Sequence, residues 1–242
     1  MQENGRVLAQ ILSAVCKEVQ PGRSTLFFDE MAESLIRDAG GVPSFKGYSG
    51  YPATINASLN EEVVHGIPSS ERKLKEGDVF SIDIGLMRDG LHVDMATTVP
   101  VGQVGETAQR MLNVAERSLW EGIEQVKIGN RLSDISHAIG SYVEAAGFHV
   151  VKEYVGHGIG KALHEDPQIP NYGPPGHGIR LRSGMALAIE PMIKVDSLPT
   201  QVQADRWTVV TGSGGLSVHF EHTIVLTESG AVVVTLGGDE KA

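Results

Sequence analysis

The sequence predicts an α+β fold made of two related halves. Two pairs of segments have helical periodicity, and each pair is followed by segments with the apolar, β-branched composition of strands. A shift of 107 residues carries Gly22 onto Gly129 and Gly40 onto Gly147, so the turns that end the helices recur as well. Solenoid arrays have shorter repeats than this. We therefore expect two pseudo-symmetric α+β halves packed into one domain.

The helical segments are defined by apolar residues at helical spacing and by the residues that end them. The first pattern stops at Pro21-Gly22, and the second segment has a capping residue at Ser24 or Thr25. Gly147 ends the last segment. The four helices are expected over residues 6–19, 24–39, 106–127 and 133–146.

Five strands are expected from apolar runs, over residues 79–86, 91–99, 185–193, 218–226 and 231–236. The first two flank Arg88-Asp89-Gly90, which indicates a hairpin. A turn centred there places Asp83 and Asp94 nearly opposite each other. Such carboxylates repel, and they would be harmless if both faced solvent. Asp83 lies in an apolar run, however, so we expect burial and a compensating positive charge.

Composition excludes several classes of function. With 41% hydrophobic and 21% charged residues, the 242-residue chain is expected to be globular and soluble. Its net charge of -10 disfavours a nucleic acid substrate. The single cysteine, Cys16, excludes a disulfide framework within the chain and fits the cytoplasm. No membrane span is expected, because no apolar run approaches the roughly 18 residues required.

Acidic residues at strand positions indicate a metal site. The 107-residue shift carries Asp83 onto Glu190, and Glu221 is a third acid within a predicted strand. Buried acids must be neutralised, paired or bound to metal, and too few lysines or arginines lie near them. His157 stands between glycines that allow close backbone approach. One imidazole with four carboxylates suits two divalent ions bridged by carboxylate, with a water between them.

Other catalytic motifs do not fit. The run from Gly156 to Lys161 is not a phosphate loop. Val155 stands where that motif requires its first glycine, and Ala162 stands where it requires serine or threonine. The sequence has no G-x-S-x-G, and His164-Glu165 lacks the second histidine of H-E-x-x-H. Hydrolysis through a serine or cysteine nucleophile is therefore unsupported.

The chain resembles the type I methionine aminopeptidases. The resemblance covers nearly the whole chain and rests on five segments in order: residues 60–68 (NEEVVHGIP), the hairpin of Asp83 and Asp94, residues 156–160 (GHGIG), Glu190-Pro191-Met192 and Glu221-His222-Thr223. It implies the pita-bread (creatinase/aminopeptidase) fold, with two pseudo-symmetric α+β halves around a central antiparallel sheet. We expect one catalytic domain over residues 1–242, with halves of about 5–102 and 103–238.

The resemblance also implies the roles of site residues. The metal ligands would be Asp83, Asp94, His157, Glu190 and Glu221. Asp94 and Glu221 would bridge two divalent ions, Asp83 would serve the first ion, and His157 with Glu190 the second. Glu190 would also accept the proton of the attacking water. The ions could be Co, Mn, Fe or Zn.

Two further histidines and an apolar pocket complete the implied site. His65 would contact the amine or amide nitrogen of the substrate, and His164 would polarise the scissile carbonyl. The methionine pocket matches Phe45, Tyr48, Tyr51, Asn56, Leu163 and Trp207. Leu163 stands where the family commonly has phenylalanine, and Asn56 where it often has cysteine.

The function implied is metal-dependent removal of the initiator methionine from nascent proteins and peptides with a small second residue. The expected enzyme is a cytoplasmic monomer in transient contact with the ribosome, with neither a nucleic acid substrate nor a membrane partner. One alternative is a proline-directed relative such as a prolidase or aminopeptidase P, which carries a large N-terminal domain and further active-site histidines. Another is a non-catalytic binding module, which usually loses metal ligands; all five are present here.

Overall fold

The computed structural model describes residues 1–237, so residues 238–242 of the expected domain lie outside the described residues. The helices are α1 (Gln2–Lys17), α2 (Thr25–Asp38), α3 (Glu106–Ile123) and α4 (Leu132–Ala145), with a short 3-10 turn at Tyr48–Gly50. The strands are β1 (Val42–Pro43), β2 (Ile55–Leu59), β3 (Glu62–Val64), β4 (Val79–Arg88), β5 (Leu91–Pro100), β6 (His149–Val150), β7 (Gly156–Gly158), β8 (Glu165–Ile169), β9 (Ala186–Ile189), β10 (Met192–Lys194), β11 (Gln201–Val202), β12 (Val209–Val210), β13 (Ser217–His219), β14 (His222–Thr227) and β15 (Gly230–Val233). Among the described residues, none of the helices has the length and apolar character that a bilayer crossing demands.

The residues at which the first two helices begin are determined by specific hydrogen bonds. Ser24 caps α2, because its hydroxyl accepts the N–H of Phe27 at 3.3 Å. The first helix, α1, begins before the apolar pattern does. Its polar first turn is held by the buried Asn4, whose side-chain amide donates to the carbonyls of Arg88 at 2.7 Å and Leu91 at 3.1 Å. Tertiary contacts thus extend the helix beyond what periodicity predicted.

The duplication is visible in hydrogen bonds that recur at the predicted shift. The N–H of Gly22 donates to the carbonyl of Leu74, and the N–H of Gly129 donates to that of Leu181. Both glycines have positive φ, 91° and 94°, a region that other residues rarely adopt. The pairing of β1 with β4 recurs as that of β6 with β10, in the equivalent register. The prediction of two pseudo-symmetric halves is therefore confirmed.

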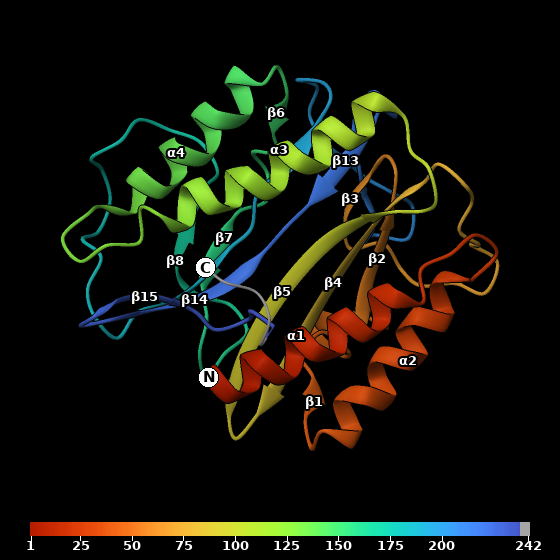
Figure 1. Cartoon of the computed structure of the whole chain (residues 1–242), viewed down its shortest axis with the longest axis horizontal. Coiled ribbons are helices and arrows are strands. Elements are labelled where there is room, and N and C mark those ends of the chain that lie inside the picture. The colour runs from red at the N-terminus through yellow and green to blue at the C-terminus, as the bar shows by residue number, and fades with distance from the viewer. Residues whose placement is uncertain (238–242) are drawn as a thin grey trace.

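In each half, a pair of helices packs on antiparallel strands, and the sheet β11–β12–β3 contains strands from both halves (Figure 1). One buried cluster packs α1 and α2 on β4 and β5, with Phe28 and Phe80 among its largest side chains. A second cluster packs α3 and α4 on the strands of the other half. The halves meet where Glu221 bridges Ala96 of β5, with the N–H of Glu221 donating at 2.9 Å. The site described below lies at this junction.

The β4–β5 hairpin corrects the predicted register. Its turn is formed by Asp89 and Gly90, both at positive φ (54° and 73°), as short hairpin turns require. Asp94 consequently pairs with Gly85, so the expectation that it lies nearly opposite Asp83 was wrong by two residues. Because strand side chains alternate with a period of two, both acids still share one face.

Two segments predicted as continuous strands are interrupted at acids. The segment 185–193 is divided into β9 and β10 around Glu190, and 218–226 is divided into β13 and β14 around Glu221. Pro191 has no N–H to donate to a ladder, which accounts for the first break. The interruptions take these two acids out of regular strand pairing.

Candidate active site

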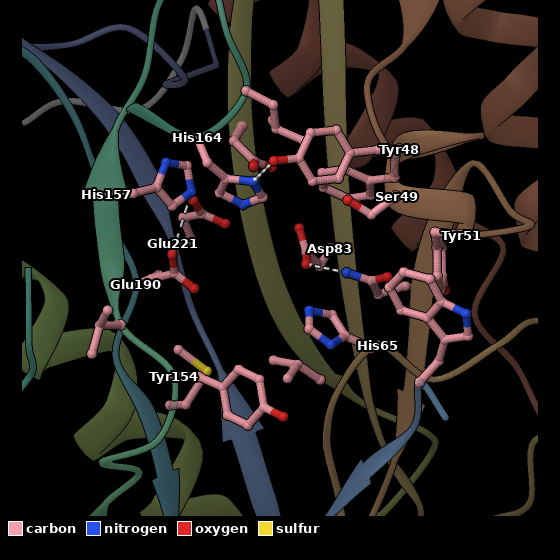
Figure 2. A pocket seen from close by; sticks show the side chains of 18 residues that line it. Tyr48, Ser49, Tyr51, His65, Asp83, Tyr154, His157, His164, Glu190 and Glu221 are labelled. Atoms are coloured by element: carbon pink, nitrogen blue, oxygen red, sulfur yellow. Dashed lines mark hydrogen bonds and ion pairs between the residues drawn. The ribbon is translucent and has the colours of Figure 1, made fainter. Parts of the chain in front are cut away.

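A cavity of about 280 Å³ is lined by residues from both halves (Figure 2). Its wall includes every residue that the sequence indicated for metal binding, catalysis or substrate binding: Phe45, Tyr48, Tyr51, Asn56, His65, Asp83, Asp94, His157, Leu163, His164, Glu190, Trp207 and Glu221. The fold therefore brings together residues that are distant in sequence.

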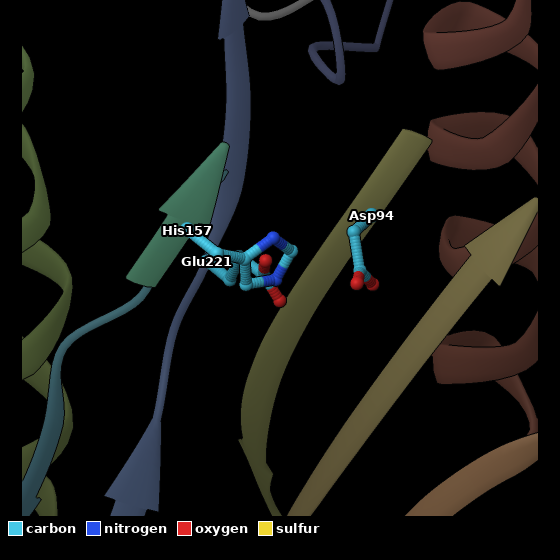
Figure 3. Close-up of side chains that lie close together, drawn as sticks. All are labelled: Asp94, His157 and Glu221. Carbon is cyan, nitrogen blue, oxygen red and sulfur yellow. The ribbon is translucent and has the colours of Figure 1, made fainter. Parts of the chain in front are cut away.

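Three buried side chains approach closely enough to share one cation. The potential ligand atoms of Asp94, His157 and Glu221 all lie within 4.8 Å of one another (Figure 3). Asp94 belongs to β5, His157 to β7, and Glu221 precedes β14. Thr223 fastens β14 to β5, since its hydroxyl accepts the N–H of Asp94 at 2.9 Å and donates to the Asp94 carbonyl at 2.7 Å.

The imidazole of His157 is oriented by its own strand. Its Nδ1 lies 2.9 Å from the carbonyl oxygen of Gly158, so Nδ1 is the donor and Nε2 keeps a lone pair. A β-bulge separates the two residues, and a Cβ at Gly158 would lie 2.2 Å from the carbonyl oxygen of Asp166. Burial lowers the pKa of His157 to about 4. A neutral imidazole with an available Nε2 is the form that binds metals.

Asp83 and Glu190 extend this group of three. One oxygen of Asp83 accepts a hydrogen bond from the side-chain amide of Asn56 at 2.5 Å. Glu190 lies between two imidazoles, with Oε1 3.5 Å from Nε2 of His157 and Oε2 3.6 Å from Nε2 of His219. Figure 2 shows Asp83 and Glu190 facing the same central space from different walls.

The cavity has the donor set of a divalent-metal site. Within residues 1–237, no lysine or arginine lines it, and Asp83, Asp94 and Glu221 each have one buried carboxylate oxygen without a hydrogen-bond partner. Burial raises the pKa of Asp83 to about 7. Burial, followed by repulsion from neighbouring acids, raises the pKa of Asp94, Glu190 and Glu221 well above its usual range. Unpaired oxygens beside a neutral imidazole fit a cation and would relieve this repulsion.

The two predicted substrate histidines stand on different parts of the wall (Figure 2). Nδ1 of His164 lies 2.8 Å from the Tyr48 hydroxyl oxygen. His65 has a positive φ of 61°, and its ring packs edge-on against Tyr154 and Trp207. Burial lowers the pKa of both histidines, that of His65 to about 4. Each ring is therefore neutral at pH 7, with one nitrogen as donor and the other as acceptor, and His164 keeps Nε2 for the substrate.

An apolar wall adjoins the acids. Phe45, Tyr51 and Leu163 are buried there, and the Tyr51 ring packs edge-on against Trp207 with centroids 5.1 Å apart. The Tyr51 hydroxyl points to backbone, 3.0 Å from the carbonyl oxygens of Ile55 and Gly66. Its ring thus offers only apolar surface, which suits a thioether side chain.

The cavity also contains residues that the sequence reasoning missed. The missed residues that do line the cavity each lie within three positions of a predicted site residue in the sequence; they are Ser49, Val64, Tyr154, Val155 and Met192. His219 was also missed: its Nε2 lies 3.6 Å from Oε2 of Glu190, but it is not among the residues that line the cavity.

Comparisons with known proteins agree with this geometry. The family model for metallopeptidase family M24 matches residues 1–228. Methionine aminopeptidase 1 of Bacillus subtilis (strain 168) is 52% identical over 235 residues, covering 97% of this chain and 94% of that protein. The methionine aminopeptidase of Clostridium acetobutylicum is 46% identical over 236 residues, covering 98% and 94%.

Solved structures show the same relationship. The crystal structure of the methionine aminopeptidase from Thermotoga maritima matches with a TM-score of 0.95 and 44% identity, covering 97% of this chain and 94% of that one. The prolidase from Pyrococcus furiosus matches with a TM-score of 0.78 and 21% identity, covering 99% of this chain and 63% of that one. The second match shows the pita-bread fold alone.

The chain belongs to metallopeptidase family M24. Within that family, it is similar over nearly its whole length to the methionine aminopeptidases, which confirms the recognition made from the five sequence segments.

Proposed function

We propose that the protein is a metal-dependent methionyl aminopeptidase, which removes the initiator methionine from nascent proteins and peptides with a small second residue. The observation that carries this proposal is the convergence of Asp94, His157 and Glu221 beside an apolar wall in one cavity. The identity of 52% to a methionine aminopeptidase supports the substrate class. A single catalytic domain over residues 1–242, with halves of about 5–102 and 103–238, is part of the proposal.

We assign two divalent ions to the cavity. Asp94 and Glu221 would bridge them, Asp83 would hold one, and His157 with Glu190 the other. When bound, the ions would lower the pKa of a shared water and polarise the scissile carbonyl. The choice among Co, Mn, Fe and Zn would follow availability as well as affinity.

Three protein groups would act on the substrate directly. Glu190 would take the proton of the attacking water, since its carboxylate faces the cavity with a side chain only 13% exposed. His164 would donate to the carbonyl oxygen as negative charge develops there, with its ring held by the Tyr48 hydroxyl. His65 would contact the amine or amide nitrogen of the substrate.

The size of the cavity supports the preference for a small second residue. About 280 Å³ is near the lower end of the range for ligand pockets, so the cavity suits a short segment of substrate rather than a bulky one. The pocket residues would be Phe45, Tyr48, Tyr51, Asn56, Leu163 and Trp207.

One assay separates this function from its alternatives. The protein is incubated with Met-Gly-Met-Met or Gly-Pro, with Mn or Co and without metal, and the products are identified by mass. Release of methionine from the first peptide, only with metal, is expected. Cleavage of Gly-Pro instead would indicate a proline-directed enzyme, and no cleavage by metal-loaded protein would indicate a binding module.

The proposal extends to the setting of the enzyme. The substrate is the N-terminus of a nascent chain, so transient contact with the ribosome is expected of a cytoplasmic monomer. Sedimentation of the free protein should give the mass of one 25.9 kDa chain. Cosedimentation with translating ribosomes should depend on ionic strength, because weak charged contacts are screened by salt.

A further inference from the structure

Asn56 lies where the apolar wall of the cavity meets the acids. It belongs to β2, which pairs with β4 so that Asn56 stands directly opposite Asp83. Side chains opposite each other in an antiparallel pair lie on one face and interact. Both line the cavity, and both are nearly inaccessible, with 5% and 8% of their surface exposed.

The side-chain amide of Asn56 is hydrogen-bonded to Asp83. Its Nδ2 donates to Oδ2 of Asp83 at 2.5 Å, and an ionised carboxylate can only accept, so the contact fixes the orientation of the amide. Oδ1 of Asp83 is buried and has no hydrogen-bond partner among residues 1–237. One oxygen is therefore held by Asn56, while the other is left for a cation.

We propose that Asn56, besides lining the pocket, is a positioning residue for Asp83, and that its amide sets metal affinity through that carboxylate. This inference rests on the proposed function, because it takes Asp83 to be a metal ligand. Partners that orient a ligand typically change metal affinity by about 10–100-fold.

The chemistry of an amide suits this role. It donates a hydrogen bond without adding a charge, whereas a lysine or arginine at this position would compete with the cation for Asp83. An aspartate would add a further acid to a cavity whose acids already repel one another. A methionine thioether, in contrast, is only a weak acceptor, so a buried amide gains little from it.

Two variants and one control test the inference. Asn56→Leu keeps the branched shape with bulkier methyl groups and no donor, and Asn56→Ala removes both the branch and the donor. Leu163→Ala is the matched control, because Leu163 lines the same pocket and is buried. Metal-free protein is titrated calorimetrically with Mn²⁺, and KM for Met-Gly-Met-Met is measured at saturating Mn²⁺, after thermal melts have shown which variants fold.

Both Asn56 variants should bind Mn²⁺ at one site about 10–100-fold more weakly than wild type. Leu163→Ala should raise KM and leave the Mn²⁺ isotherm unchanged. If one Asn56 variant does not fold, the other decides. Unchanged Mn²⁺ affinity together with a raised KM would make Asn56 a pocket wall and overturn the inference, while the proposed function would stand. A wild-type protein that binds no Mn²⁺ would overturn both.

Discussion

Replacing Asp83 by asparagine in the metal-free protein isolates the energetic consequence of burying that carboxyl group. Burial raises the pKa of Asp83 from 3.8 to about 7, although the hydrogen bond from Asn56 opposes the rise. The folded protein therefore holds a proton that the unfolded chain releases above about pH 4. Stability is lost as the pH rises toward 7 and then levels off.

The magnitude follows from the interval of pH. Between pH 5 and pH 8, the folded state retains this proton over nearly two pH units, which corresponds to about 2–3 kcal/mol of stability at roughly 1.4 kcal/mol per unit. Asparagine has no such proton, so Asp83→Asn should gain this amount relative to wild type over the interval. Losing Asp83 also lowers the repulsion that raises the pKa of Asp94, which acts in the same direction. Buried histidines titrate in both proteins and cancel in the comparison.

Urea denaturation measures the effect. Unfolding curves of both proteins in EDTA at pH 5 and pH 8 give the stability gap at each pH. With Mn²⁺ at pH 8, the stability gap should shift toward wild type, since a bound cation favours the ionised carboxylate that only wild type has. A gap in EDTA that is constant with pH, or that moves toward wild type, would refute the reasoning.

Three further predictions concern other parts of the site. Dialysis against a strong chelator should abolish methionine release from Met-Gly-Met-Met, and added Co or Mn should restore it; full activity in protein shown to be metal-free by elemental analysis would contradict the mechanism. His164→Ala should lower kcat and kcat/KM together by about 10²–10³ with bound metal unchanged, and Tyr48→Phe should have a smaller effect of the same kind. Loss of one metal equivalent in His164→Ala would instead make that residue a ligand. Gly158→Ala should destabilise the fold by about 1–3 kcal/mol, because the new Cβ would meet a carbonyl oxygen at 2.2 Å; a Tm equal to that of wild type would show that the strands can separate there.

The parts of the fold that could be predicted from sequence are those determined by neighbouring residues, such as helix caps and glycine turns. The cap at Ser24 and the glycines with positive φ at 22 and 129 mark helix ends without reference to the rest of the chain. The 107-residue shift also relates Asp83 to Glu190, because a duplicated fold places equivalent residues at equivalent points. The glycine turns recur in both halves, so each half supports the interpretation of the other.

The parts that the sequence did not predict depend on contacts between distant segments. The hairpin register is set by which two residues take positive φ, and the choice of Asp89 and Gly90 moved the pairing by two residues. The hydrogen bond from Asn56 to Asp83 needs the register of β2 against β4, which hydrophobic periodicity does not determine. His219 was missed because a histidine in an apolar strand is not distinguishable by pattern from a core residue.

The location of the site at the junction of the halves links metal binding to the stability of the fold. Asp94 comes from the first half, whereas His157 and Glu221 come from the second, so neither half alone supplies the group of three. The halves are already joined there by the Ala96–Glu221 bridge, so the acids are held together despite their mutual repulsion. A cation shared by these ligands would add a link across the same junction and remove that repulsion. Binding should therefore stabilise the association of the halves as well as supply the chemistry.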